Sequence, residues 1–133
     1  MRIEDHLCSL DQSARLYELG VRQHTAHWFR NDHADNPGRY PNQWYVISDF
    51  DYPLAGEHKP VKYDNNGFLL NAFTVSELGL LLPMAQYNFQ QGKIATGEKW
   101  FMGYGIKYVY GMTEAECRAN MLIHLIEEKD LVV

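Results

Sequence analysis

Cysteine is scarce in this chain, which has only Cys8 and Cys117 among its 133 residues. The two lie far apart in the sequence and form no C-x-x-C motif. In a cytosolic protein, cysteines without such a motif more often stay reduced in the interior than form a disulfide. We therefore expect two buried free thiols.

Long hydrophobic runs are also missing. The longest, residues 78–84, is interrupted by Pro83, whereas a membrane-spanning helix needs about 20 consecutive apolar residues. The first residues of the chain contain no apolar segment of the kind found in signal peptides. The sequence thus predicts a cytoplasmic protein without a membrane partner.

Runs of lysine or arginine are absent, and acidic residues outnumber basic ones by 17 to 12, for a net charge of −5. An acidic surface repels phosphate backbones, so non-specific nucleic-acid binding is disfavoured. A local basic patch would still allow a nucleic-acid-associated accessory role in replication or regulation. That role is the main alternative to the protein-binding role inferred below.

Apolar residues, by contrast, are plentiful. They make up 46% of the sequence, and aromatic residues make up 14%, including nine Tyr and three Trp. This content is enough to build a packed interior, and the chain length suits one domain with one core. We expect residues 1–133 to form a single domain.

Three capping boxes, S/T-x-x-E/Q, predict where helices begin. They start at Ser9, Thr74 and Thr113. In this motif the first side chain accepts a hydrogen bond from the backbone N–H three residues on, and the Glu or Gln side chain reaches back. In the first helix, Gln12 is expected to face mostly water. The predicted helices are residues 9–19, a short segment from Thr74 that ends at Pro83, and residues 113–129.

The segments between these helices are rich in aromatic and β-branched residues and are separated by turn-forming residues. Residues 26–30 and 43–50 are predicted to be strands joined by a long loop. Further hairpins are expected between residues 61–63 and 68–70, and between residues 87–90 and 98–104, the latter extended by residues 107–110. This order predicts an α+β fold, with three helices packed on a small antiparallel β-sheet.

Three groups of residues carry a resemblance to known proteins. They are residues 8–10, 16, 18–21 and 23; residues 73–79, 82 and 83; and residues 113–116, 118, 119, 121–123 and 125–127. On these residues the chain resembles small uncharacterised proteins encoded by phages, prophages and other mobile elements, common in gut Bacteroidetes. Its layout and closing alanine-rich helix are also similar to the phage α/β/α sandwich domain family. The resemblance implies a mobile-element origin and supports the fold, and it implies no activity, cofactor or site residue.

The strongest metal-ligand pattern is His24 and His27, followed by Asp32, His33 and Asp35. Imidazole and carboxylate groups together suit zinc or another divalent ion, and such a site would indicate a metal-dependent hydrolase. The spacing opposes this hypothesis, because positions 24 and 27 of a strand point to opposite faces and no H-E-x-x-H motif is present. The residues are predicted to be polar loop residues, and we expect no metal or other cofactor.

A nucleophilic pair of Cys117 and His124 is a further possibility, because the two lie two turns apart on one helix face. A rise of about 10 Å separates them, which is too far for a direct hydrogen bond. A half-buried thiol and a histidine at the rim of the helix is the simpler interpretation. No catalytic residue is predicted, and the protein is expected not to be an enzyme.

Aromatic residues gather near the end of the chain, where Trp100, Tyr104, Tyr108 and Tyr110 are predicted to form an interaction surface. If these four share one sheet face, Phe101 lies on the other, and one face then exposes aromatic rings. An exposed aromatic face is typical of a protein–protein or oligomer interface. We therefore expect a non-enzymatic protein that binds a protein partner or itself, rather than nucleic acid.

Overall fold

The computed structural model describes residues 3–21, 25–32, 43–48, 68–83, 89–94, 99–104, 107–128 and 131, apart from the side chains of Glu4, Phe89 and Tyr104. In chain order the described elements are η1 (Ile3–His6), α1 (Leu10–Glu18), β1 (His27–Asn31), β2 (Tyr45–Ser48), β3 (Phe68–Ala72), α2 (Val75–Leu81), β4 (Phe89–Lys93), β5 (Trp100–Tyr104), β6 (Lys107–Gly111) and α3 (Glu114–Glu127). Helices and antiparallel strands occur together, so the predicted α+β class is confirmed.

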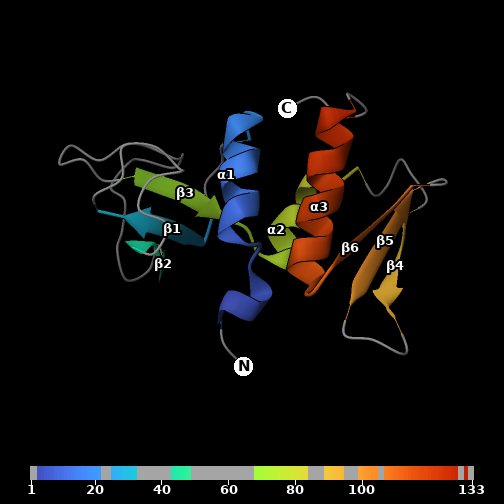
Figure 1. Cartoon of the computed structure of the whole chain (residues 1–133), viewed down its shortest axis with the longest axis horizontal. Coiled ribbons are helices and arrows are strands. Elements are labelled where there is room, and N and C mark those ends of the chain that lie inside the picture. Colours follow the sequence, from blue (N-terminus) through green and yellow to red (C-terminus); the bar gives the residue numbers. More distant parts are fainter. Residues whose placement is uncertain are drawn as a thin grey trace.

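The helices stand between two antiparallel sheets (Figure 1). One sheet has the strand order β2-β1-β3, and the other has the order β4-β5-β6. Helix α1 packs against the first sheet, α3 packs against the second, and α2 contacts α3. The described strands are therefore divided between two sheets, and the helices join them.

The N-caps confirm all three predicted helix starts. The side chains of Ser9 and Thr74 accept from the backbone N–H three residues on, and both capping boxes are complete. Thr113 caps α3 by accepting from the Glu116 N–H at 3.1 Å. Gly20 follows the end of α1 with φ of 95°, a left-handed conformation that suits a residue without Cβ.

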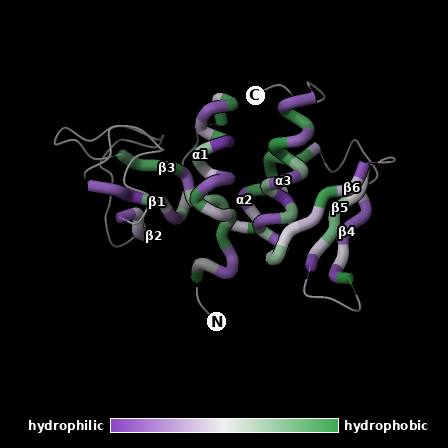
Figure 2. The backbone as a smooth tube through the Cα atoms, viewed as in Figure 1, coloured by the Kyte–Doolittle hydropathy of each residue, from purple (hydrophilic) through white to green (hydrophobic). Residues whose placement is uncertain are grey.

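The first sheet packs one of its faces against α1. Phe29 of β1 lies opposite Leu70 of β3, and both belong to the cluster that Tyr17 of α1 joins. The ring of Tyr17 meets that of Phe68 edge-on, with centroids 5.4 Å apart. Strand β3 is buried along its whole length and is largely hydrophobic (Figure 2), so it forms the inner wall of this half of the molecule. A separate buried cluster on the sheet's other face consists of Trp28, Ile47 and Leu69.

The predicted strand pairs are confirmed where the structure describes both partners. Strands β1 and β2 pair antiparallel, as do β4 with β5 and β5 with β6. Strand β3 pairs with β1 from end to end. Residues 61–63 lie outside the described part of the chain, so their hairpin with residues 68–70 stays a prediction.

The largest core cluster joins all three α-helices to the second sheet. Leu16 of α1, Leu78 of α2 and Leu122 of α3 are fully buried there, together with Met102 of β5. None of the helices in the described residues has the length and apolar content that crossing a bilayer requires.

The position of Gln12 differs from the prediction that it faces water. Its side chain is buried between α1 and α3, where its Nε2 donates to the Glu116 carbonyl at 2.8 Å and to Asn120 Oδ1 at 2.7 Å. Its Oε1 completes the capping box by accepting from the Ser9 N–H at 2.9 Å. The reason is tertiary, because α3 covers the side of α1 that would otherwise meet solvent.

Candidate functional site

The residues of the second sheet fall into two sets on opposite faces. Directly paired residues of an antiparallel ladder point to the same face, and successive residues alternate. Met102 lies opposite Val109, and both pack in the core beside α3. Phe101 lies opposite Tyr110, which is 52% exposed, so this set faces away from the helices.

This register separates the four aromatic residues that the sequence groups together. Trp100 and Tyr104 occupy the same register as Met102, and Trp100 packs against the core. Tyr108 and Tyr110 occupy the opposite register, with Phe101. The prediction that Trp100, Tyr104, Tyr108 and Tyr110 share one face is therefore wrong. In this pairing the odd-numbered residues of β5 lie on the same face as the even-numbered residues of β6.

We call Phe101, Tyr108 and Tyr110 the outward aromatic face. Two glycines support its rings: a Cβ on Gly92 of β4 would lie 3.2 Å from Phe101 Cε1, and one on Gly103 of β5 would lie 2.5 Å from Tyr108 Cε1. The rings of Phe101 and Tyr108 therefore lie over the glycines of the neighbouring strand, where no side chain lifts them from the sheet.

The outward aromatic face has solvent-exposed tyrosines and no charged side chain among its described residues. Tyr108 is 50% exposed, close to the value for Tyr110. Within the three strands, the remaining outward positions are Gln90, Gly92 and Gly103, so the described face contains no charged residue. Each tyrosine offers an apolar ring and a polar hydroxyl, a combination that is enriched at protein interfaces.

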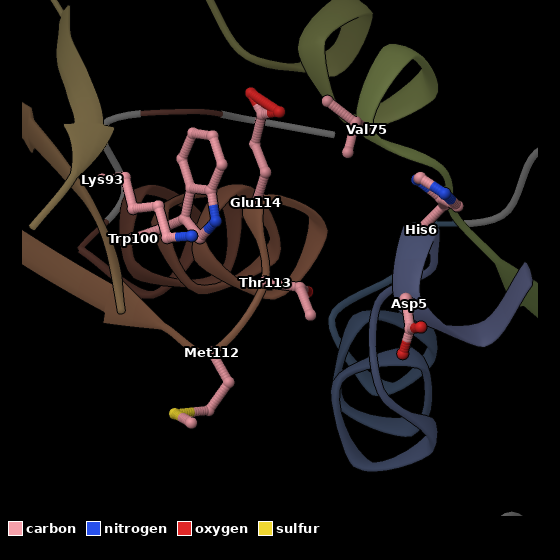
Figure 3. Close-up of a pocket in the computed structure, with 8 residues that line it drawn as sticks. All are labelled: Asp5, His6, Val75, Lys93, Trp100, Met112, Thr113 and Glu114. Carbon is pink, nitrogen blue, oxygen red and sulfur yellow. The ribbon is translucent and has the colours of Figure 1, made fainter. Parts of the chain in front are cut away.

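A pocket of about 330 Å³ lies between the second sheet and η1 (Figure 3). Lys93 and Trp100, which pair across β4 and β5, form one wall, and Asp5 and His6 of η1 lie on the opposite side. The lining is completed by Val75, Met112, Thr113 and Glu114. The sequence gives no signal for this pocket, because its walls come from five elements far apart in the chain.

Two polar residues of the pocket, Thr113 and Glu114, have contacts that serve the fold. Thr113 caps α3, and Glu114 lies 3.6 Å from Nη2 of Arg118 in an ion pair. Arg118 Nη1 donates to the Val75 carbonyl at 3.0 Å, which ties α3 to the first turn of α2. Although Asp5, His6 and Glu114 all line the pocket, the described residues contain no group of three that could hold a metal ion.

The predicted metal-ligand segment is described only in part. His24, His33 and Asp35 lie outside the described residues, so their role stays a prediction. Asp32 accepts hydrogen bonds from Arg30 Nε at 2.8 Å and from the Tyr45 hydroxyl at 2.9 Å. His27 lies in strand β1 and not in a loop, so the loop prediction is wrong for this residue, and its buried Nδ1 has no hydrogen-bond partner in the described structure.

The two thiols are free and buried, as predicted, and Cys117 is buried more completely than the half-buried thiol expected from its position on the helix. Burial raises the pKa of Cys8 to about 11, although its Sγ lies 3.1 Å from the Ser13 hydroxyl. Burial, and then the Glu114 carboxylate, raise the pKa of Cys117 to about 11 as well. A nucleophilic cysteine needs its thiolate at neutral pH, so these environments do not suit catalysis.

Comparison of the chain with known protein families, with curated proteins and with solved structures finds no match.

Proposed function

We propose that this protein acts by binding another protein through the outward aromatic face, without catalysing a reaction. One observation carries the proposal: two half-exposed tyrosines flank Phe101 on an uncharged sheet face that the helices do not cover. On the resemblance described above, we further propose that the protein has this binding role in a phage or other mobile element.

The physical properties of the face favour a protein partner. Aromatic residues are enriched and charged residues depleted at the centres of protein interfaces. Phe101 and Tyr108 lie over Gly92 and Gly103, and an aromatic side chain has only two rotatable bonds to order on binding. The face can therefore contribute apolar burial at low entropic cost.

A nucleic-acid partner fits this face less well. Binding single strands requires basic side chains among the aromatic rings, which neutralise phosphates. In the outward register the nearest described lysine is Lys99, which precedes β5, while Lys93 and Lys107 belong to the inner register. The net charge of −5 adds to the repulsion.

Affinity capture with matched variants tests the proposal. Tagged wild-type protein and a Tyr108→Ser/Tyr110→Ser variant are used as bait in nuclease-treated host lysate, and bound proteins are quantified by mass spectrometry. A Leu80→Ser variant is the control, because Leu80 is 88% exposed and lies on α2, away from the sheet.

We expect one stoichiometric partner that the wild type and the Leu80 variant retain and that the double tyrosine variant loses at least tenfold. Both tyrosines are half exposed, so the double variant should keep the fold, which its thermal unfolding curve verifies. Equal capture by all three proteins would refute binding through this face. Capture that occurs in a parallel untreated lysate and is lost after nuclease treatment would favour the nucleic-acid alternative.

A further inference from the structure

The two edge strands of the second sheet, β4 and β6, differ in whether other elements contact their outward backbone groups. Ile94 donates its N–H to the Lys99 carbonyl at 2.9 Å, so the even-numbered residues of β4 direct their backbone groups toward β5. The odd-numbered residues, Phe89, Gln91 and Lys93, consequently direct their N–H and C=O groups outward. In the described structure no strand pairs with that edge.

The opposite edge, β6, is partly closed by α3. The same alternation directs the backbone groups of Tyr108 and Tyr110 outward, and Asn120 Nδ2 of α3 donates to the Tyr110 carbonyl at 2.6 Å. Helix α3 also crosses the end of β6, where a Cβ on Gly111 would clash with the backbone of Cys117. Among the described residues, strand β4 is thus the open edge of the sheet, and an open edge is a template for another strand.

The geometry points to a second copy of this chain as the occupant: we propose that β4 pairs antiparallel with β4 of another molecule about a two-fold axis at Gln91. In that register Gln91 faces Gln91 of the second copy, and Phe89 faces Lys93. The three residues with outward backbone groups then pair only with one another, and their N–H and C=O groups match along the whole strand.

Charge and closure support the same arrangement. Lys93, the charged residue of β4, faces Phe89 rather than another lysine, so no like charges oppose each other. A two-fold axis joins the two open edges and leaves no further β4 edge for a third molecule. Because the axis is perpendicular to the sheet, both outward aromatic faces lie on one side of a six-stranded sheet. The pairing does not depend on the proposed function of that face.

The central test is the mass of the purified full chain by sedimentation equilibrium over a range of concentrations. We expect the mass to rise from the monomer value of 15.5 kDa toward twice that value. Gln91→Glu and Gln91→Lys each place like charges at the axis and should weaken the dimer about fivefold. An equimolar mixture of the two variants should form a heterodimer at least as strong as the wild-type dimer.

Proline supplies a second variant whose effect depends on edge geometry. The Gln91 N–H points away from β5, so Gln91→Pro keeps the hairpin bonds but removes the bond at the axis, and the dimer should be lost. Gln90→Glu and Gln90→Lys are the controls, since Gln90 would face Gly92 of the second copy, and dimerisation should persist. A wild type that stays monomeric, or a Gln91→Pro variant that dimerises like the wild type, would overturn the proposal.

Discussion

Gln12 shows how one side chain contributes to two levels of the fold. Its amide completes the N-cap of α1 and also bonds to the Glu116 carbonyl and Asn120 of α3. Replacing it by Ala removes the cap partner and leaves the Glu116 carbonyl without this donor. Gln12→Ala should lower the free energy of unfolding by about 2 kcal/mol, as measured by urea denaturation.

The matched control for that change is Glu18→Ala. Glu18 forms an exposed ion pair with Arg15, 3.1 Å apart, at the other end of α1. Exposed pairs contribute little, so the free energy of unfolding should change by less than about 0.5 kcal/mol. Equal losses for the two variants would show that the buried contacts of Gln12 add nothing.

The buried thiols predict a stability change at alkaline pH. The ordinary thiol pKa of 9.0 applies to the unfolded chain, and burial raises the pKa of Cys8 and Cys117 to about 11 in the native protein. Because the unfolded state loses these protons first, the free energy of unfolding falls as pH rises from about 9 to about 11, and is unaffected below that window. The maximum slope is about 1.4 kcal/mol per pH unit for each thiol.

Urea denaturation across that alkaline range, with wild type and a Cys8→Ala/Cys117→Ala variant, measures this effect. The variant should be less stable at neutral pH because it has lost buried atoms, and its stability should fall less steeply above pH 9. Parallel pH profiles would mean that both thiols titrate alike in the native and unfolded states.

At the scale of elements, the junction of β6 and α3 depends on a close backbone approach. A Cβ on Gly111 would lie 2.8 Å from Cys117 Cα and 2.9 Å from the Glu116 carbonyl carbon. Backbone atoms cannot rotate away, so Gly111→Ala should destabilise the protein by about 1–3 kcal/mol, as measured by thermal or urea unfolding. In Gly79→Ala the new Cβ meets only side-chain atoms of Arg118, which can give way at the cost of the Arg118 bond to the Val75 carbonyl, and the gain in helix propensity offsets part of that cost. Similar losses for both variants would contradict this account of the junction.

The elements themselves were largely predictable, because their signals are local. The capping residues Ser9, Thr74 and Thr113 determine helix starts within four residues of sequence, and the structure places helices there. Which face of α1 is buried depends on α3, more than 90 residues away in the chain, so the position of Gln12 was not predictable from its own helix. Strand pairing is non-local in the same sense.

At the scale of the whole molecule, the described strands form two sheets that flank one group of helices (Figure 1). Nothing in the spacing of the strands indicates that β1, β2 and β3 separate from the later three. For the candidate site, the sequence correctly predicts that Tyr108 and Tyr110 are surface aromatic residues. Trp100 packs against the core instead, because it shares the register of Met102. Phe101 belongs to this face because it pairs with Tyr110 across β5 and β6, and the sequence alone does not specify that pairing.

Hydroxyl-radical footprinting of the captured complex tests most directly whether the outward aromatic face binds a protein. Free protein should be labelled at Tyr108, Tyr110 and Tyr45, which are 50%, 52% and 41% exposed. In the complex, labelling of Tyr108 and Tyr110 should fall severalfold, while Tyr45 on the first sheet keeps its labelling and serves as the internal reference. Unchanged labelling of Tyr108 and Tyr110 in a stoichiometric complex would contradict the account.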